Sequence, residues 1–212
     1  MTVANDSITV TPGSGATVAT HLANSKEHQV VILSTADGHL YGSEMTYVYA
    51  TGNSANVAAA RTTHFDLFNA TGSGMEVEVW AVYIIPTLAA VTGVGLTWEI
   101  ARSTTVGSGG TTKAAALLDS TNDAVNANIT ARSKPTGGAT IGTVIAYPNT
   151  SSEETSPYAG LASTLNHLNF IGGGIGPLQP FTLRENEGMK IDQTTNSSVG
   201  STNIVVVVSI HA

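Results

Sequence analysis

Apolar and polar residues alternate in several short stretches of this chain, and alternation with a period of two is the pattern of half-buried β-strands. It is clearest over residues 64–68, 75–79 and 96–102. In the last stretch the apolar positions are Leu96, Trp98 and Ile100. We therefore predict three strands here, the third with these apolar side chains on one face.

The stretch 75–85 changes character halfway along. Its first half alternates, so Glu76 and Glu78 are predicted to face away from the apolar side chains, whereas residues 80–85 are all apolar. A strand of this kind leaves solvent and becomes covered, by a second sheet or by a neighbouring subunit. Pro86 is predicted to end the strand, because proline has no N–H to donate to a ladder.

The same patterns predict further strands at residues 129–134, 140–147, 181–183, 189–193 and 204–210. The last of these is apolar on both faces, and an exposed edge of that kind would aggregate. We expect it to be a central strand or to be covered by another subunit.

Other segments are less definite. Residues 8–10 and 29–33 read as short strands, and residues 42–60 read as an exposed arm or a long loop, because they contain few bulky apolar residues. Residues 111–127 are compatible with an extended segment or with one helical turn. Residues 153–168 begin as a loop and are the second candidate for a short helix.

About eight to ten strands, with turn signals every 8–15 residues and no alternation of strands with helices, predict an all-β sandwich of the jelly-roll kind. We expect an N-terminal arm with the first strands in residues 1–60 and the sandwich in residues 61–212, as one domain overall.

Composition narrows the possible functions. Only 11% of the 212 residues are charged and the formal net charge is −7, whereas charged residues make up about a quarter of an average domain. The eight basic residues form no cluster, which disfavours direct binding to nucleic acid or to anionic membranes. The chain has no cysteine, no apolar run long enough for a membrane span and no recognisable secretion signal.

The motif search finds no nucleophile or phosphate loop. Serine stands between glycines at residues 13–15, 72–74 and 107–109, but none of these is a Gly-x-Ser-x-Gly elbow, and we interpret them as turns. The glycines of residues 172–176 are followed by Pro177 and include no lysine, so they are not a phosphate-binding loop.

The six histidines have no pair at the i,i+2 or i,i+4 spacing of metal ligands; they are His21, His28, His39, His64, His167 and His211. His21 and His28 lie seven residues apart, which is a weak signal. We expect surface or interface histidines, with His64 and His211 at strand ends facing solvent or a partner chain.

Carboxylates and tryptophans give further candidates. Glu76 and Glu78 share a strand face about 7 Å apart, which is typical of a solvated surface, as is the pair Glu153–Glu154. The segment with Asp119, Asn122 and Asp123 would suit a cation, but it is better explained as a turn. We therefore expect no catalytic, cofactor-binding or metal-binding residue, and no enzyme. Trp80 and Trp98 leave open a carbohydrate-binding β-sandwich with aromatic stacking platforms.

Several stretches of strand and turn resemble structural proteins of tailed bacteriophages. They are SITVTPGSGATVAT, HFDLFNATGSGMEVEVWAVYIIP, LTWEIARSTTVGSGG, PTGGATIGTVIAY and LRENEGMKIDQTTNSSVGSTNIVVVVSI. The resemblance is to a jelly-roll family of virion proteins, covers most of residues 61–212 and is weaker over residues 16–60.

This resemblance implies a head decoration, or cement, protein without catalytic residues or cofactor. Its expected partners are the major capsid protein and further copies of itself, in a homotrimer, and its expected location is the virion, assembled in the host cytoplasm. A tail, neck or fibre-base protein is the alternative within the same family of functions. The low charge agrees with surfaces that become buried in assembly, because charged residues are depleted from interface cores.

Overall fold

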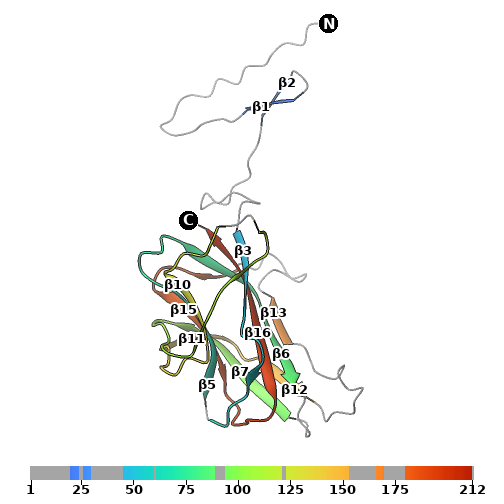
Figure 1. The fold of residues 1–212 in the computed structure, drawn as a ribbon, viewed down its shortest axis with the longest axis vertical. Coiled ribbons are helices and arrows are strands. Elements are labelled where there is room, and N and C mark those ends of the chain that lie inside the picture. Colours follow the sequence, from blue (N-terminus) through green and yellow to red (C-terminus); the bar gives the residue numbers. More distant parts are fainter. Residues whose placement is uncertain are drawn as a thin grey trace. The chain divides into compact units, whose positions relative to one another are not determined.

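The computed structural model describes residues 20–23, 26–29, 45–59, 61–88, 94–120, 123–152, 166–169 and 180–211. The chain forms two compact units, residues 1–43 and residues 44–212. In the first unit, the described residues form an antiparallel hairpin of two strands, β1 (Thr20–Ala23) and β2 (Lys26–Gln29) (Figure 1).

The second unit is a sandwich of two antiparallel sheets packed against each other (Figure 1). We call the first sheet I; its strands are β5 (Thr62–Asn69), β7 (Val94–Ser103), β8 (Thr111–Lys113), β10 (Ile129–Ser133), β11 (Ile141–Ala146), β12 (Asn149–Ser152) and β15 (Glu187–Gln193). We call the second sheet II; its strands are β3 (Met45–Ala50), β4 (Ser54–Ala55), β6 (Glu76–Leu88), β9 (Ala116–Leu117), β13 (Asn166–Asn169), β14 (Phe181–Leu183) and β16 (Ser201–His211).

The strand order is that of a jelly roll. Sheet I runs β5-β15-β7-β11, with β10 and β8 added beyond β5, and sheet II runs β3-β16-β6-β14. The predicted all-β, jelly-roll-like sandwich is therefore confirmed. The described residues contain sixteen strands rather than eight to ten, because short strands such as β4, β8 and β9 leave no periodic pattern in the sequence.

The core lies between the two sheets and follows the predicted alternation. Trp98, Ile100 and Phe65 of sheet I and Ile204 and Val206 of sheet II are all fully buried. The predicted common face of Leu96, Trp98 and Ile100 is confirmed. Each such aliphatic or aromatic side chain contributes about 1.5–3 kcal/mol when it leaves water, so these central strands supply much of the stability.

Strand β6 does change from an alternating to a continuously apolar pattern, as predicted, and a β-bulge lies at the point of change. Val208 pairs with Val79 but Val207 pairs with Ala81, so Trp80 is the extra residue. Before the bulge the odd positions face the core, and after it the even positions do, as the burial of Val82 shows. The bulge therefore accounts in part for the loss of alternation over residues 80–85, because it moves the core-facing positions from odd to even residues.

One prediction about the ends of these strands was wrong. Pro86 does not end β6, which continues to Leu88 with a second register shift opposite Thr202. Proline is tolerated there because no described strand pairs with β6 at this position on the side opposite β16.

Strand β16 is central, between β6 and β3, as predicted for a strand apolar on both faces.

The interpretation of residues 42–60 as an exposed arm or a long loop was also wrong for residues 45–50. Residues 45–50 form β3, and the side chains of Tyr47 and Tyr49 are only 1% and 2% exposed. The boundary between the two units lies at residues 43 and 44, so β3 belongs to the unit that contains the sandwich. Two tyrosines at alternate positions supply enough apolar area to anchor a strand in a sequence otherwise rich in small residues.

In the ambiguous segment 111–127, residues 111–113 and 116–117 form β8 and β9, and the described residues contain no helix. The predicted strand at residues 8–10 and residues 30–33 lie outside the described residues, as does most of the helix candidate at residues 153–168. Its last residues, 166–168, belong to strand β13 and are not helical.

Candidate functional site

The largest concentration of buried charge lies on the face of sheet I that points away from sheet II. We call it the charged cluster; its members are Arg61, Asp66, Glu99, Arg132, Lys190 and Asp192. Cross-strand pairing assembles it, because Lys190 lies opposite Asp66 on β5 and Asp192 lies opposite Glu99 on β7. The sequence pattern did not reveal this cluster, because charged residues at alternate strand positions are normally solvated.

Ion pairs connect four members of the charged cluster, Arg61, Glu99, Lys190 and Asp192. Nζ of Lys190 lies 3.0 Å from Oδ2 of Asp192, and Nη2 of Arg61 lies 2.5 Å from Oε2 of Glu99. Arg61 also approaches Asp192, with Nε 3.7 Å from Oδ2. The hydroxyl of Thr63 donates to Oδ1 of Asp192 at 2.8 Å. These pairs hold the acids in place within the sheet.

Two loops cover the cluster, residues 104–110 and residues 134–140. A bridge between Ser108 and Gly137 joins them, and the backbone N–H of Gly107 donates to Oδ2 of Asp66 at 2.7 Å. A β-carbon on Gly107 would lie 2.9 Å from this carboxylate oxygen, so only glycine allows the close approach. The cover leaves Asp66 fully buried.

Burial raises the pKa of Asp66 to about 6, although the N–H of Gly107 and the charges of Lys190 and Arg132 act in the opposite direction. A raised carboxyl pKa is a common property of a general acid, but such a group must reach its substrate. Asp66 is sealed beneath the two loops, so in this structure it acts as an anchor for the cover.

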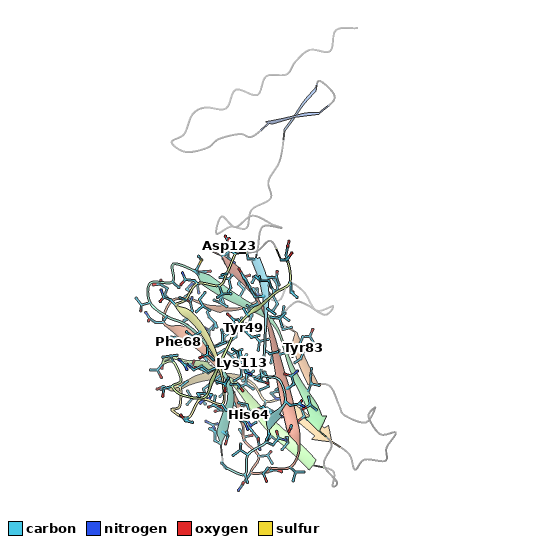
Figure 2. The ribbon with its side chains drawn as sticks, in the orientation of Figure 1. Tyr49, His64, Phe68, Tyr83, Lys113 and Asp123 are labelled. Atoms are coloured by element: carbon cyan, nitrogen blue, oxygen red, sulfur yellow. The ribbon has the colours of Figure 1, made fainter. Side chains whose placement is uncertain are left out.

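His64 lies between the sheets, where we had expected it to face solvent or a partner, so that prediction was wrong (Figure 2). It is the extra residue of a bulge in β5, which turns it toward the core. Its ring meets Trp98 edge to face with centroids 5.1 Å apart, and its Nε2 lies 3.0 Å from Oε1 of Gln193. Burial, aided by the charge of Lys134, lowers its pKa to about 4.

Glu76 and Glu78 lie on the outward face of sheet II, as predicted. Oε1 of Glu76 is 3.2 Å from Nε of Arg184, and the hydroxyl of Ser209 donates to Glu78 at 3.4 Å. The ring of His211 lies near both acids, at 3.8 and 4.0 Å, and is only 9% exposed. The expectation that His211 faces solvent was therefore wrong.

The two tryptophans differ in accessibility. Trp98 is fully buried and its Nε1–H donates to Thr150, so it cannot stack against a sugar. Trp80 is half-buried, and its Nε1–H donates to Ser209 at 2.7 Å. Of the two stacking platforms suggested by the sequence, only Trp80 stays accessible.

The remaining candidates of the sequence fall into turns or outside the described residues. Gly72 and Gly74 adopt positive φ in a turn, as predicted. Asp123 uses its backbone carbonyl to accept the hydroxyl of Tyr47, and Asn122 lies outside the described residues. Residues 13–15 and 172–176 also lie outside them. Among the residues described, no group of three or more His, Cys, Asp or Glu side chains is placed to hold a metal ion.

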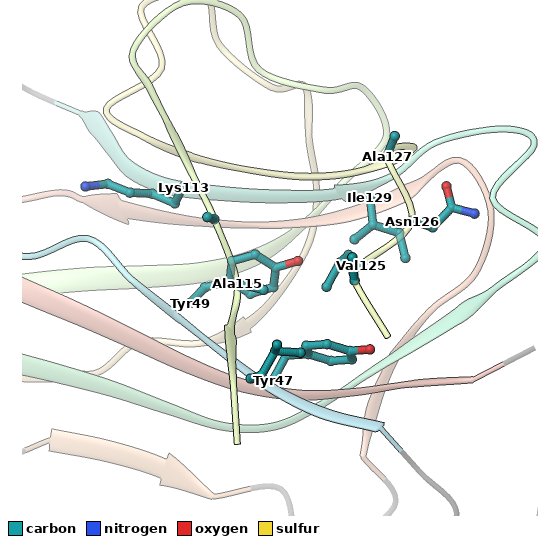
Figure 3. A pocket seen from close by; sticks show the side chains of 11 residues that line it. Tyr47, Tyr49, Lys113, Ala115, Val125, Asn126, Ala127 and Ile129 are labelled. Atoms are coloured by element: carbon teal, nitrogen blue, oxygen red, sulfur yellow. The ribbon is translucent and has the colours of Figure 1, made fainter. Parts of the chain in front are cut away.

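A pocket of about 310 Å³ lies where β3 meets the segments 113–117 and 124–127 (Figure 3). Its walls are mostly apolar, and the hydroxyl of Tyr49 is buried among them without a hydrogen-bond partner in the described residues. Burial is the main cause that raises the pKa of Tyr49, and the neighbouring Tyr47 raises it further. The phenol therefore stays protonated. This pocket could not be predicted from the sequence, because alanines from separate segments line it.

The edge strand β11 is the other surface with unusual chemistry. Ile141, Ile145 and Tyr147 are 36%, 38% and 69% exposed, and residues 135–152 include no charged side chain. In the described residues β11 pairs only with β7, so it forms one border of sheet I. Edge strands usually carry charges that prevent association, and β11 carries none.

No helix among the described residues is long and apolar enough to cross a membrane. Comparisons of the chain with protein-family models, with curated proteins and with solved structures find no match in any of the three. The arguments for function therefore rest on the surfaces and clusters described above.

Proposed function

We propose that the chain is a non-enzymatic structural protein of a tailed-phage virion, a decoration protein that binds and stabilises the outer surface of the head. Its partners in this proposal are the major capsid protein and further copies of itself, in a trimer. The resemblance of its strand and turn stretches to phage virion proteins suggests this role, and its jelly-roll sandwich agrees with it.

The observation that carries the proposal is the uncharged, partly apolar border formed by β11. Exposed large apolar residues at one edge are typical of a surface that another protein covers. The chain has a net charge of −7, so two copies repel each other wherever their acids face. Residues 135–152 avoid this repulsion, and we assign the contact between copies to this border.

The placement of the charged side chains also supports a contact between copies at the β11 border. Glu99, Lys190 and Asp192 are almost fully buried in ion pairs, and Asp66 anchors a covering loop. These side chains stabilise sheet I from outside, and they leave the neighbouring border uncharged. Such a molecule fits a role in which extended surfaces, rather than a cleft, make the functional contacts.

Binding to heads tests the proposal. Purified chain is added to phage particles that lack it, and bound protein is measured after sedimentation of the particles. Saturable binding to heads, with a smaller release of DNA on heating, is the expected result. A chain that stays in the supernatant at every concentration contradicts the proposal. Binding confined to tails would favour the tail or neck alternative instead.

A further inference from the structure

The pocket beside β3 is lined by residues of both sheets. Tyr47 and Tyr49 belong to sheet II, whereas Lys113 of β8 and Ile129 of β10 belong to sheet I. The other wall residues are mostly alanines. The volume of about 310 Å³ is about twice that of an apolar protein cavity of about 150 Å³ that holds benzene. The pocket therefore has room for a molecule of up to about twelve non-hydrogen atoms.

The hydroxyl of Tyr49 is the one side-chain polar group of this wall that has no hydrogen-bond partner among the described residues. The side chain is almost fully buried, and in Figure 3 its hydroxyl points across the pocket toward Val125. The other polar side chains of the wall, Tyr47, Lys113 and Asn126, each donate to a backbone carbonyl at 2.7–2.9 Å. A buried hydroxyl without a partner is unfavourable, so a bound molecule that supplies an acceptor is favoured.

The charges around the pocket favour an uncharged ligand. Burial raises the pKa of the Tyr49 phenol, which therefore stays protonated and donates its hydrogen bond. Lys113 is the one charged residue of the wall, and its ammonium group donates to the carbonyl of Thr51. In Figure 3 this ammonium group points away from the hydroxyl of Tyr49. A carboxylate or phosphate beside Tyr49 would lose its water without gaining a cation.

We propose that the pocket beside β3 binds a small, uncharged, ring-containing molecule whose carbonyl oxygen accepts a hydrogen bond from the hydroxyl of Tyr49. Aromatic and cyclic ketones are the class of ligand with this chemistry. The apolar wall takes up the ring, and Tyr49 fixes its orientation, as single polar groups do in small-molecule sites. The site is independent of the proposed virion function, because its wall includes no residue of the β11 border.

The first test compares two probes of similar shape, acetophenone and α-methylstyrene, of which only acetophenone has a carbonyl oxygen. Each is titrated into the full chain and followed by amide NMR spectra. Tyr49→Phe should weaken acetophenone binding about five-fold, the value of one net hydrogen bond, and should not weaken α-methylstyrene. Tyr83→Phe, which removes a hydroxyl outside the pocket, should change neither affinity. No saturable binding of acetophenone, or an equal change for both probes in Tyr49→Phe, overturns the proposal.

A second test asks whether the pocket itself is the site and whether the ligand is uncharged. Ala115→Phe places a ring in the pocket and should weaken acetophenone binding at least ten-fold. Ala58→Phe adds the same ring at an exposed position outside the wall and should leave binding unchanged. Benzoate, which has the size of acetophenone and a negative charge, should bind at least five-fold more weakly than acetophenone. Unchanged binding in Ala115→Phe, an equal loss in Ala58→Phe, or binding of benzoate as tight as that of acetophenone contradicts the proposed site.

Discussion

The backbone N–H of Gly107 donates a 2.7 Å hydrogen bond to Oδ2 of Asp66, and this bond fastens the loop 104–110 over the outward face of sheet I. The carboxylate is fully buried, and the cations Lys190 and Arg132 act on it. An acid in this position costs free energy when it is charged, because it has lost its water. The protein keeps it as an acceptor for the cover.

The variant Asp66→Asn is expected to be more stable than the wild type at pH 8. The amide oxygen still accepts the N–H of Gly107, and no buried charge is formed. The pKa of Asp66 is raised from 3.8 to about 6, so its contribution to stability is full below pH 4 and is lost as the pH rises through 6. Urea unfolding should show a gain of about 1–3 kcal/mol at pH 8 and little difference at pH 4.

The control for this prediction is Asp66→Ala, which removes the acceptor and leaves the N–H of Gly107 buried and unpaired. It should lose about 1–3 kcal/mol of stability at pH 4, and less at pH 8, where the substitution also removes the buried charge. Lower stability of Asp66→Asn than of the wild type at pH 8 would show that the ion pairing outweighs the burial cost.

His64 is expected to give an opposite pH dependence. Its pKa is lowered from 6.5 to about 4 by burial beside Trp98, so the fold favours the neutral ring. Its contribution is full above pH 6.5 and is lost as the pH falls toward 4. An NMR titration of the histidine ring signals, assigned by comparison with His64→Gln, should give a midpoint near 4. A midpoint near 6.5 would mean that the ring reaches solvent.

The two tryptophans are expected to differ in their effect on stability. Trp98→Ala removes a fully buried ring and its hydrogen bond to Thr150, and should cost about 3–5 kcal/mol in urea unfolding. Trp80→Ala removes a half-buried ring and its bond to Ser209, and should cost about 1–2 kcal/mol. A larger cost for Trp80 would contradict the assignment of Trp98 to the core.

The border formed by β11 is expected to control self-association. Ile145→Lys places a charge on the uncharged border and should shift the chain from oligomer to monomer in light scattering, with a change in stability below about 1 kcal/mol. Leu118→Lys is the matched control, because Leu118 is 62% exposed but lies beyond β9 in another part of the chain. An oligomer unaffected by Ile145→Lys, or broken equally by Leu118→Lys, would place the contact elsewhere.

The sequence predicted those parts of the fold in which alternation is regular. The burial of Trp98 and the central position of β16 follow directly from the pattern of apolar residues. Bulges were not predictable, because one extra residue such as Trp80 or His64 changes the inward face without any change in composition. The sequence therefore placed His64 at the surface, whereas the structure buries it.

The candidate sites were less predictable than the fold. The charged cluster depends on the register between four strands and on two covering loops, neither of which a single strand pattern contains. Exposed apolar residues on β11 were present in the sequence, but a strand pattern does not distinguish an edge from a centre.

The number of copies of the chain in each virion tests the central proposal most directly. Under this proposal it is measured by quantitative mass spectrometry of purified phage particles, with the major capsid protein as internal reference. A decoration protein should be present in a number comparable to that of the major capsid protein. A few copies per particle would indicate a tail, neck or fibre-base protein, and complete absence from the particles would contradict a virion role.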